Sequence, residues 1–80
     1  MNRIKFLRKG QEKSFLNMIL KELNCPSLKE LSNRIEINYS SLKNYYSEAR
    51  LLPKETFENL CLISGISKNS FLFKEIKGYW

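Results

Sequence analysis

The chain has 80 residues, of which 42% are hydrophobic and 28% are charged, and its formal net charge is +6. This length excludes a second domain, the composition argues against wholesale disorder, and no apolar stretch is long enough to span a membrane. The opening residues 1–11 interleave charged with apolar side chains, unlike a secretory signal. We therefore expect one domain, residues 1–80, in the cytoplasm.

The residue types that are missing exclude several kinds of chemistry. The chain has no His and no Asp, and all eight acidic residues are Glu. Histidine-based acid–base catalysis, Ser-His-Asp triads and His-containing zinc sites are therefore excluded. Cys25 and Cys61 stand far apart and match no metal or redox spacing, which predicts two buried, reduced thiols. We expect no enzyme, no metal and no cofactor.

Positive charge is concentrated at the start of the chain. Residues 1–9 contain no acid and four basic residues, Arg3, Lys5, Arg8 and Lys9. Residues 25–50 carry only a net +1. A basic excess is typical of a surface that binds phosphate, although many soluble proteins share it.

A first helix is predicted over residues 11–23. It begins after Gly10, and Asn24 with the following Pro26 ends it. Its apolar residues repeat at the spacing of one helix face, and they are Phe15, Leu16, Ile19, Leu20 and Leu23.

Two short helices are predicted next. Ser27 and Glu30 match a capping box, in which each side chain accepts a hydrogen bond from the backbone amide of the other residue. The second helix therefore starts at Leu28, and its inward face ends at Ile35. Asn38 is a candidate N-cap for a third helix over residues 39–47.

The rest of the chain predicts a fourth helix and two weak strands. Residues 48–52 are expected to cross the surface, and Pro53 suits the first position of a helix over residues 53–64. Alternating apolar residues at both ends of the chain indicate short strands, namely Ile4 and Phe6 near the start and Phe71 and Phe73 near the end. An antiparallel pairing of the two ends would cover the helical core.

The stretch LKELSNRIEINYSSLKNYYSEARLLPKETFENLCLISGIS, which starts at Leu28, resembles the Cro/repressor-type helix-turn-helix family. The resemblance implies a mainly α fold of four to five helices, with a helix-turn-helix core at about residues 28–47. Members of that family usually have Gly at the turn position that Glu36 occupies here, so we expect a slightly different turn, and the exact tilt of the third helix stays open. The ends, IKFLRKG and KGYW, are similar to small archaeal helix-turn-helix domains that precede homing-endonuclease-like regions. Because the chain has no Asp, only the binding part of such a protein is expected.

The resemblance implies sequence-specific binding of double-stranded DNA, most simply for transcriptional regulation. In the family, the first turns of the third helix read base edges in the major groove. Asn44 then suits adenine, and Lys43 suits guanine or phosphate. The implied DNA-binding residues are Ser27, Lys29, Tyr39, Ser40, Lys43, Asn44 and Arg50, of which Ser27, Lys29 and Arg50 would contact the phosphate backbone.

Other interpretations stay open at this point. Lys43 and Asn44 could form an ordinary solvated helix face, Ser27 is first of all a cap, and the whole domain could be a protein-interaction or assembly module. The C-terminal aromatic residues could belong to the core or to a homodimer surface, and they are Phe71, Phe73, Tyr79 and Trp80. The basic opening could be a flexible arm on DNA or a structural element, and its alternating apolar residues favour the second.

Overall fold

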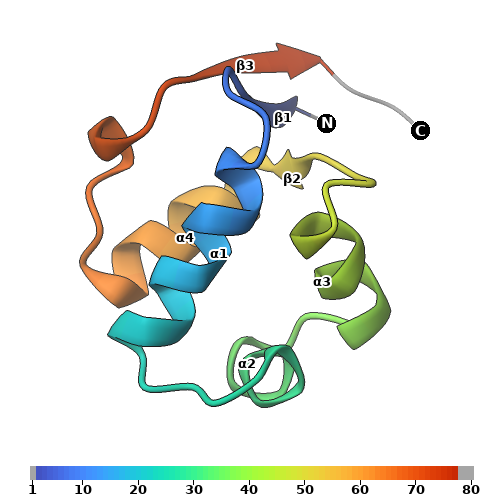
Figure 1. The fold of residues 1–80 in the computed structure, drawn as a ribbon, viewed down its shortest axis with the longest axis vertical. Coiled ribbons are helices and arrows are strands. Elements are labelled where there is room, and N and C mark those ends of the chain that lie inside the picture. The colour runs from blue at the N-terminus through green and yellow to red at the C-terminus, as the bar shows by residue number, and fades with distance from the viewer. Residues whose placement is uncertain (1, 78–80) are drawn as a thin grey trace.

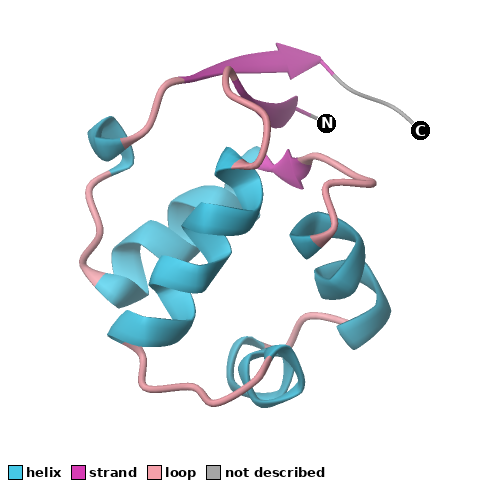
Figure 2. Cartoon of the chain, in the orientation of Figure 1, coloured by secondary structure: helices cyan, strands magenta, loops and turns pink. Residues whose placement is uncertain are grey.

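The structure is a computed structural model that describes residues 2–77 (Figure 1). In chain order the elements are β1 (Asn2–Phe6), α1 (Gln11–Glu22), α2 (Leu28–Ile35), α3 (Tyr39–Tyr46), β2 (Leu52–Pro53), α4 (Lys54–Ser64), the 3-10 turn η1 (Lys68–Ser70) and β3 (Phe73–Lys77). The strands lie together at one end of the molecule, and the helices occupy the rest (Figure 2). The four predicted helices are confirmed, with bounds that differ by at most one residue.

The strands form one antiparallel sheet in the order β2–β1–β3, so the protein belongs to the α+β class. The predicted mainly α, four- to five-helix Cro/repressor-like class was therefore wrong. The two chain ends do pair, from Asn2 opposite Lys77 to Phe6 opposite Phe73. The strand that the sequence did not reveal is β2.

Strand β2 takes up the last residue of the predicted surface crossing and the predicted first residue of α4. Leu52 is fully buried and lies opposite Ile4 in the sheet, whereas Pro53 lies opposite Arg3. Proline is tolerated here because β2 is short and forms the edge of the sheet, where a missing N–H costs little. Pro53 is thus the N-cap of α4 instead of its first residue.

An aromatic cluster joins the sheet to α1 and α4. Its ring centroids lie 4.9 to 6.4 Å apart, and its members are Phe6, Phe15, Phe57, Phe71 and Phe73. Such tilted and edge-on contacts stabilise a core beyond the burial of area alone. The first part of the basic opening, Asn2–Phe6, is therefore a structural strand that buries Ile4 and Phe6. Tyr79 and Trp80 lie outside the described residues.

The remaining core follows the predicted helix faces. Cys25 and Cys61 are both buried and free, as predicted. Within residues 2–77, no helix combines the length and the apolar character needed to cross a membrane.

Candidate nucleic-acid interface

Two short helices, α2 and α3, are joined by a three-residue turn and fixed to the core by their inward faces. Leu31 of α2 and Leu42 of α3 are fully buried, and Tyr45 is nearly so. Ser32 is buried as well, and its hydroxyl donates a hydrogen bond to the carbonyl of Lys29 at 2.6 Å. A small side chain whose polar group is satisfied within its own helix lets α3 pack closely on α2.

The turn between these helices is left-handed at Glu36. This residue has φ 58° and ψ 39°, and the next amide, of Ile37, donates to the carbonyl of Ser32 at 3.1 Å. The expectation that Glu36 would produce a different turn is therefore wrong, since Glu takes the left-handed conformation that glycine adopts most readily. The conformation costs about 1 kcal/mol for a residue with a Cβ atom.

Both helices are capped by their own flanking residues. The Ser27 hydroxyl accepts a hydrogen bond from the amide of Glu30 at 3.2 Å, and the Asn38 side chain accepts one from the amide of Ser40 at 2.8 Å. Of the predicted capping box only this first half forms, because no described hydrogen bond joins the amide of Ser27 to the Glu30 carboxylate. Ser27 and the neighbouring Lys29 are exposed at the start of α2.

The outward face of α3 carries the four residues predicted to read bases. At 100° per residue, Tyr39, Ser40, Lys43 and Asn44 span an arc of about 140°, opposite the buried Leu42 and Tyr45. The ammonium of Lys43 lies 4.9 Å from the centroid of the Tyr39 ring, a cation–π contact one helical turn apart. Tyr39, Ser40 and Lys43 are exposed, whereas Asn44 is half-buried.

The seventh predicted residue, Arg50, follows α3 and is half-buried. Its backbone amide donates to the carbonyl of Asn44 at 3.2 Å, so the chain turns back on the end of α3. The structure thus brings Tyr39, Ser40, Lys43 and Asn44 onto one face. Ser27 and Lys29 sit at the start of the other helix, and Arg50 at the exit from α3.

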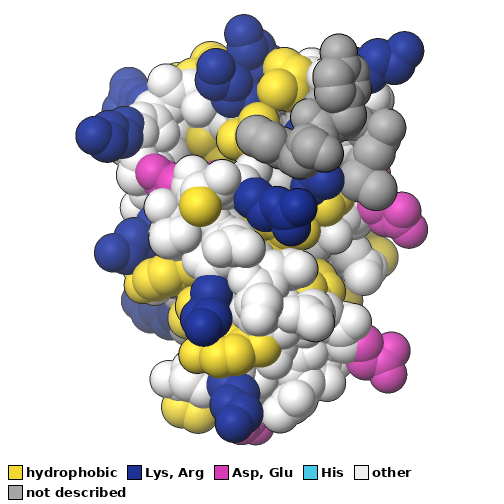
Figure 3. All heavy atoms as spheres, turned by 90° about the vertical axis from the view of Figure 1, so that its right-hand side faces the viewer, with side chains coloured by type: hydrophobic (Ala, Val, Ile, Leu, Met, Phe, Trp, Pro, Cys, Tyr) yellow, Lys and Arg dark blue, Asp and Glu magenta, His cyan; other side chains and the backbone are white. Residues whose placement is uncertain are grey.

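The side of the molecule that carries α3 is rich in basic groups (Figure 3). Lys and Arg side chains are spread over this face from top to bottom, whereas acidic side chains are seen mainly at its edges. Hydrophobic side chains lie between them. This distribution would attract a polyanion toward α3.

One contact that positions α3 was not predicted from the sequence. The Glu48 carboxylate accepts hydrogen bonds from the amides of Gly10 at 3.1 Å, Glu12 at 3.1 Å and Lys13 at 3.3 Å, so a residue beyond the end of α3 caps the start of α1. The backbone of Glu48 itself has the left-handed conformation, with φ 65°. The only sequence signal is indirect: Gly10 precedes the helix and has no side chain that could cap it.

A second carboxyl lies beside this cap. Glu12 is only 3% exposed, and no described residue hydrogen-bonds to its Oε2 atom. Burial, and next the charge of Glu48, raise the pKa of Glu12 from 4.5 to about 8. Glu12 is therefore largely protonated at neutral pH, so little second negative charge lies beside the Glu48 carboxylate that accepts from the amides of α1.

A second contact with α1 holds the same C-terminal end of α3. The hydroxyl of Tyr46 donates to Oδ1 of Asn17 at 2.9 Å, and the ammonium of Lys13 lies 5.2 Å from the Tyr46 ring centroid. Together with Glu48, Tyr46 makes the orientation of α3 depend on α1.

Comparison of the chain with protein-family models, with curated proteins and with solved structures finds no match in any of the three. Among the residues that the structure describes, no three His, Cys, Asp or Glu side chains come together as metal ligands would.

Proposed function

We propose that this protein binds double-stranded DNA in a sequence-specific way, with α3 in the major groove. The observation that carries the proposal is the outward arc of Tyr39, Ser40, Lys43 and Asn44, on a helix whose opposite face is held in the core. A rigidly held helix with polar and basic side chains pointing outward is what reading base edges requires. The spacing of α2, turn and α3 is that of a helix-turn-helix unit, which supports the same reading.

Each side chain has a chemical task in this proposal. Asn44 donates to and accepts from the edge of adenine, and Lys43 binds guanine or a phosphate oxygen. Ser27, Lys29 and the free amides at the start of α2 bind one phosphate strand, and Arg50 binds another. Such contacts to phosphate fix the register, whereas Asn44 supplies specificity.

The cellular role that fits best is transcriptional regulation in the cytoplasm. One α3 covers one stretch of major groove, so two copies on neighbouring half-sites would give useful specificity. A homodimer through the C-terminal aromatic segment stays a prediction. In the described part of that segment, Phe71 and Phe73 face the core, whereas Leu72 is exposed.

The test is binding to duplex DNA, first to a random library and then to the sites selected from it. Asn44→Ala should weaken binding to the selected site by about 1 to 3 kcal/mol and leave random duplex almost unchanged. Lys43→Ala should weaken binding and also reduce its dependence on salt if Lys43 meets a phosphate. The matched controls are Asn59→Ala and Lys21→Ala, since both residues are exposed on other helices.

Three results would contradict the proposal. They are no binding to duplex at low salt, a flat salt dependence, and equal losses for Asn44→Ala and Asn59→Ala. The first two would favour the protein-interaction module.

A further inference from the structure

The outward face of the β1–β3 pair carries two lysines directly opposite each other. The register of the two strands places Lys5 opposite Lys74. Two residues further along, the backbone amide of Leu7 donates a hydrogen bond to the carbonyl of Leu72 at 3.0 Å, so the antiparallel pairing continues past Lys5. Side chains alternate along a strand, and Ile4 points into the core, so Lys5 and Lys74 point away from it. Both lysines are exposed.

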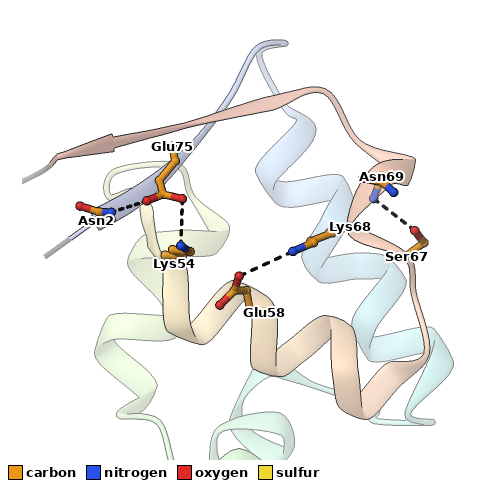
Figure 4. Close-up of polar contacts among 7 residues, drawn as sticks. All are labelled: Asn2, Lys54, Glu58, Ser67, Lys68, Asn69 and Glu75. Atoms are coloured by element: carbon orange, nitrogen blue, oxygen red, sulfur yellow. Dashed lines mark hydrogen bonds and ion pairs between the residues drawn. The ribbon is translucent and has the colours of Figure 1, made fainter.

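No acidic side chain of these strands compensates for this pair. The one acid in β1 and β3 is Glu75, which stands opposite Ile4 and therefore belongs to the other face. Its carboxylate contacts the ammonium of Lys54 at 3.2 Å and accepts a hydrogen bond from the side-chain amide of Asn2 (Figure 4). Within residues 2–77, neither Lys5 nor Lys74 forms an ion pair.

A like-charge pair directly across two strands destabilises a sheet. When two opposite residues exchange backbone hydrogen bonds, their Cα atoms are about 5.5 Å apart. The ammonium groups of Lys5 and Lys74 can therefore approach one anion together. The exposed Arg8 and Lys9 follow β1 after Leu7 and extend the positive charge along the chain. An anionic partner would therefore relieve a cost that the protein bears when it is alone.

We infer that this face, which we call the lysine ladder (Lys5 and Lys74), binds the phosphate backbone of the same duplex that α3 engages. The inference rests on the proposed function. Lys and Arg side chains continue over the face of α3 to the end of the molecule where the sheet lies (Figure 3). The longest dimension of the protein is 30 Å, close to one turn of duplex at about 34 Å, so a duplex held by α3 extends past both ends of that helix.

A competing partner is an anionic membrane. Leu7 and Leu72 are 56% and 55% exposed beside the lysine ladder, and lysines next to exposed leucines also suit lipid headgroups. Duplex DNA is favoured because the basic groups continue onto the face of α3. The experiment includes vesicles so that the two partners are distinguished.

The test compares two double variants with equal loss of charge. Lys5→Gln with Lys74→Gln neutralises the lysine ladder. The control, Lys21→Gln with Lys77→Gln, removes two charges elsewhere, because Lys77 lies on the opposite face of β3 and Lys21 on α1. Binding to random and selected duplex is measured across a salt titration, and the melting temperature of each variant is recorded.

In the variant that lacks Lys5 and Lys74, affinity should depend less steeply on salt. The magnitude of the slope of log affinity against log salt should decrease by about 0.9 for each lost contact, equally on random and selected duplex. The melting temperature of this variant should not fall, because a repulsive pair has been removed. The control should leave the slope nearly unchanged. Equal slopes in the two double variants would overturn the inference.

The outcomes separate this inference from the proposed function. If the ladder variant binds like the control while Asn44→Ala still loses the selected site, the inference fails and the proposed function stands. If the parent protein does not bind duplex at all, the proposed function fails as well. Binding to vesicles of phosphatidylserine and phosphatidylcholine that is lost only in the ladder variant would assign the face to lipid and overturn the inference.

Discussion

The helices α1 and α2 begin in opposite ways. Helix α2 is capped by the residue that precedes it, because the Ser27 hydroxyl accepts from the amide of Glu30. Helix α1 follows Gly10, which has no side chain to offer, and its first amides donate to Glu48, which lies 35 to 38 residues away in sequence. The Ser27 cap stabilises only the start of its own helix, α2. The Glu48 cap also fixes the position of the end of α3 relative to α1.

This difference has a functional consequence under the proposed function. A local cap such as Ser27 affects how well α2 forms, but a cap that comes from Glu48 affects where the end of α3 lies. The positioning of α3 thus depends on a carboxylate that is not among the residues proposed to contact DNA. Variants at these two caps can separate stability from orientation.

The largest effect is expected from Glu48→Ala. The variant removes a charged acceptor from three amides at the start of α1, which should lower the free energy of unfolding by about 3 kcal/mol. Denaturant unfolding at pH 5, where Glu12 is protonated in the folded protein, measures the loss. Glu55→Ala is the control, since Glu55 is exposed in the first turn of α4. Equal effects of the two variants would show that the tertiary cap contributes little.

The next effect concerns the carboxyl beside this cap. The folded-state pKa of Glu12 is raised to about 8 from 4.5, so the folded protein binds a proton that the unfolded chain releases between these values. Stability therefore falls as the pH rises from about 4.5 to 8, and changes little from this source above that.

Glu12→Gln should remove this part of the pH dependence and raise the free energy of unfolding by about 2 kcal/mol at pH 8. At pH 4 the parent protein and the variant should differ little, because Glu12 is mostly neutral in both the folded and the unfolded state. Thermal unfolding from pH 4 to 9 provides the measurement, with Glu22→Gln, on the exposed end of α1, as the control. Parallel pH profiles of parent and Glu12→Gln would refute the assignment.

A smaller effect is expected at the local cap. Ser27→Ala should lower the free energy of unfolding by about 1 kcal/mol, because the amide of Glu30 loses its acceptor. Ser27→Asp should restore stability, since a carboxylate accepts the same hydrogen bond and suits the start of a helix. Ser14→Ala, at an exposed position inside α1, should be neutral or slightly stabilising. A loss at Ser14 as large as the loss at Ser27 would argue against the cap.

The contrast between the two caps also explains how much of the structure could be predicted. The positions of α2 and α3 were predictable because Ser27 and Asn38 act on amides two or three residues away. Strand β2 was not predictable: Leu52 and Pro53 look like a crossing and a helix start, and only pairing with β1 makes them a strand. With two strands expected instead of three, the fold was classed as mainly α. The outward arc of α3 was expected from the resemblance to the helix-turn-helix family, whereas the role of Glu48 depends on contacts across the fold.

The smallest effect separates backbone strain from capping most directly. It uses the same substitution, to glycine, at two glutamates whose backbones have the left-handed conformation. Glu36 and Glu48 have φ values of 58° and 65°, so both bear a strain that glycine would relieve. The side chain of Glu36 makes no hydrogen bond to any described residue, and Glu36→Gly should raise the free energy of unfolding by about 0.5 kcal/mol. Glu48→Gly relieves similar strain but also removes the acceptor for α1, so it should be strongly destabilising. Opposite signs in denaturant unfolding would show that Glu48 stays in a strained conformation because it caps α1. A gain of stability at both positions would mean that backbone strain dominates, and a loss at both would mean that Glu36 bears no strain that glycine relieves.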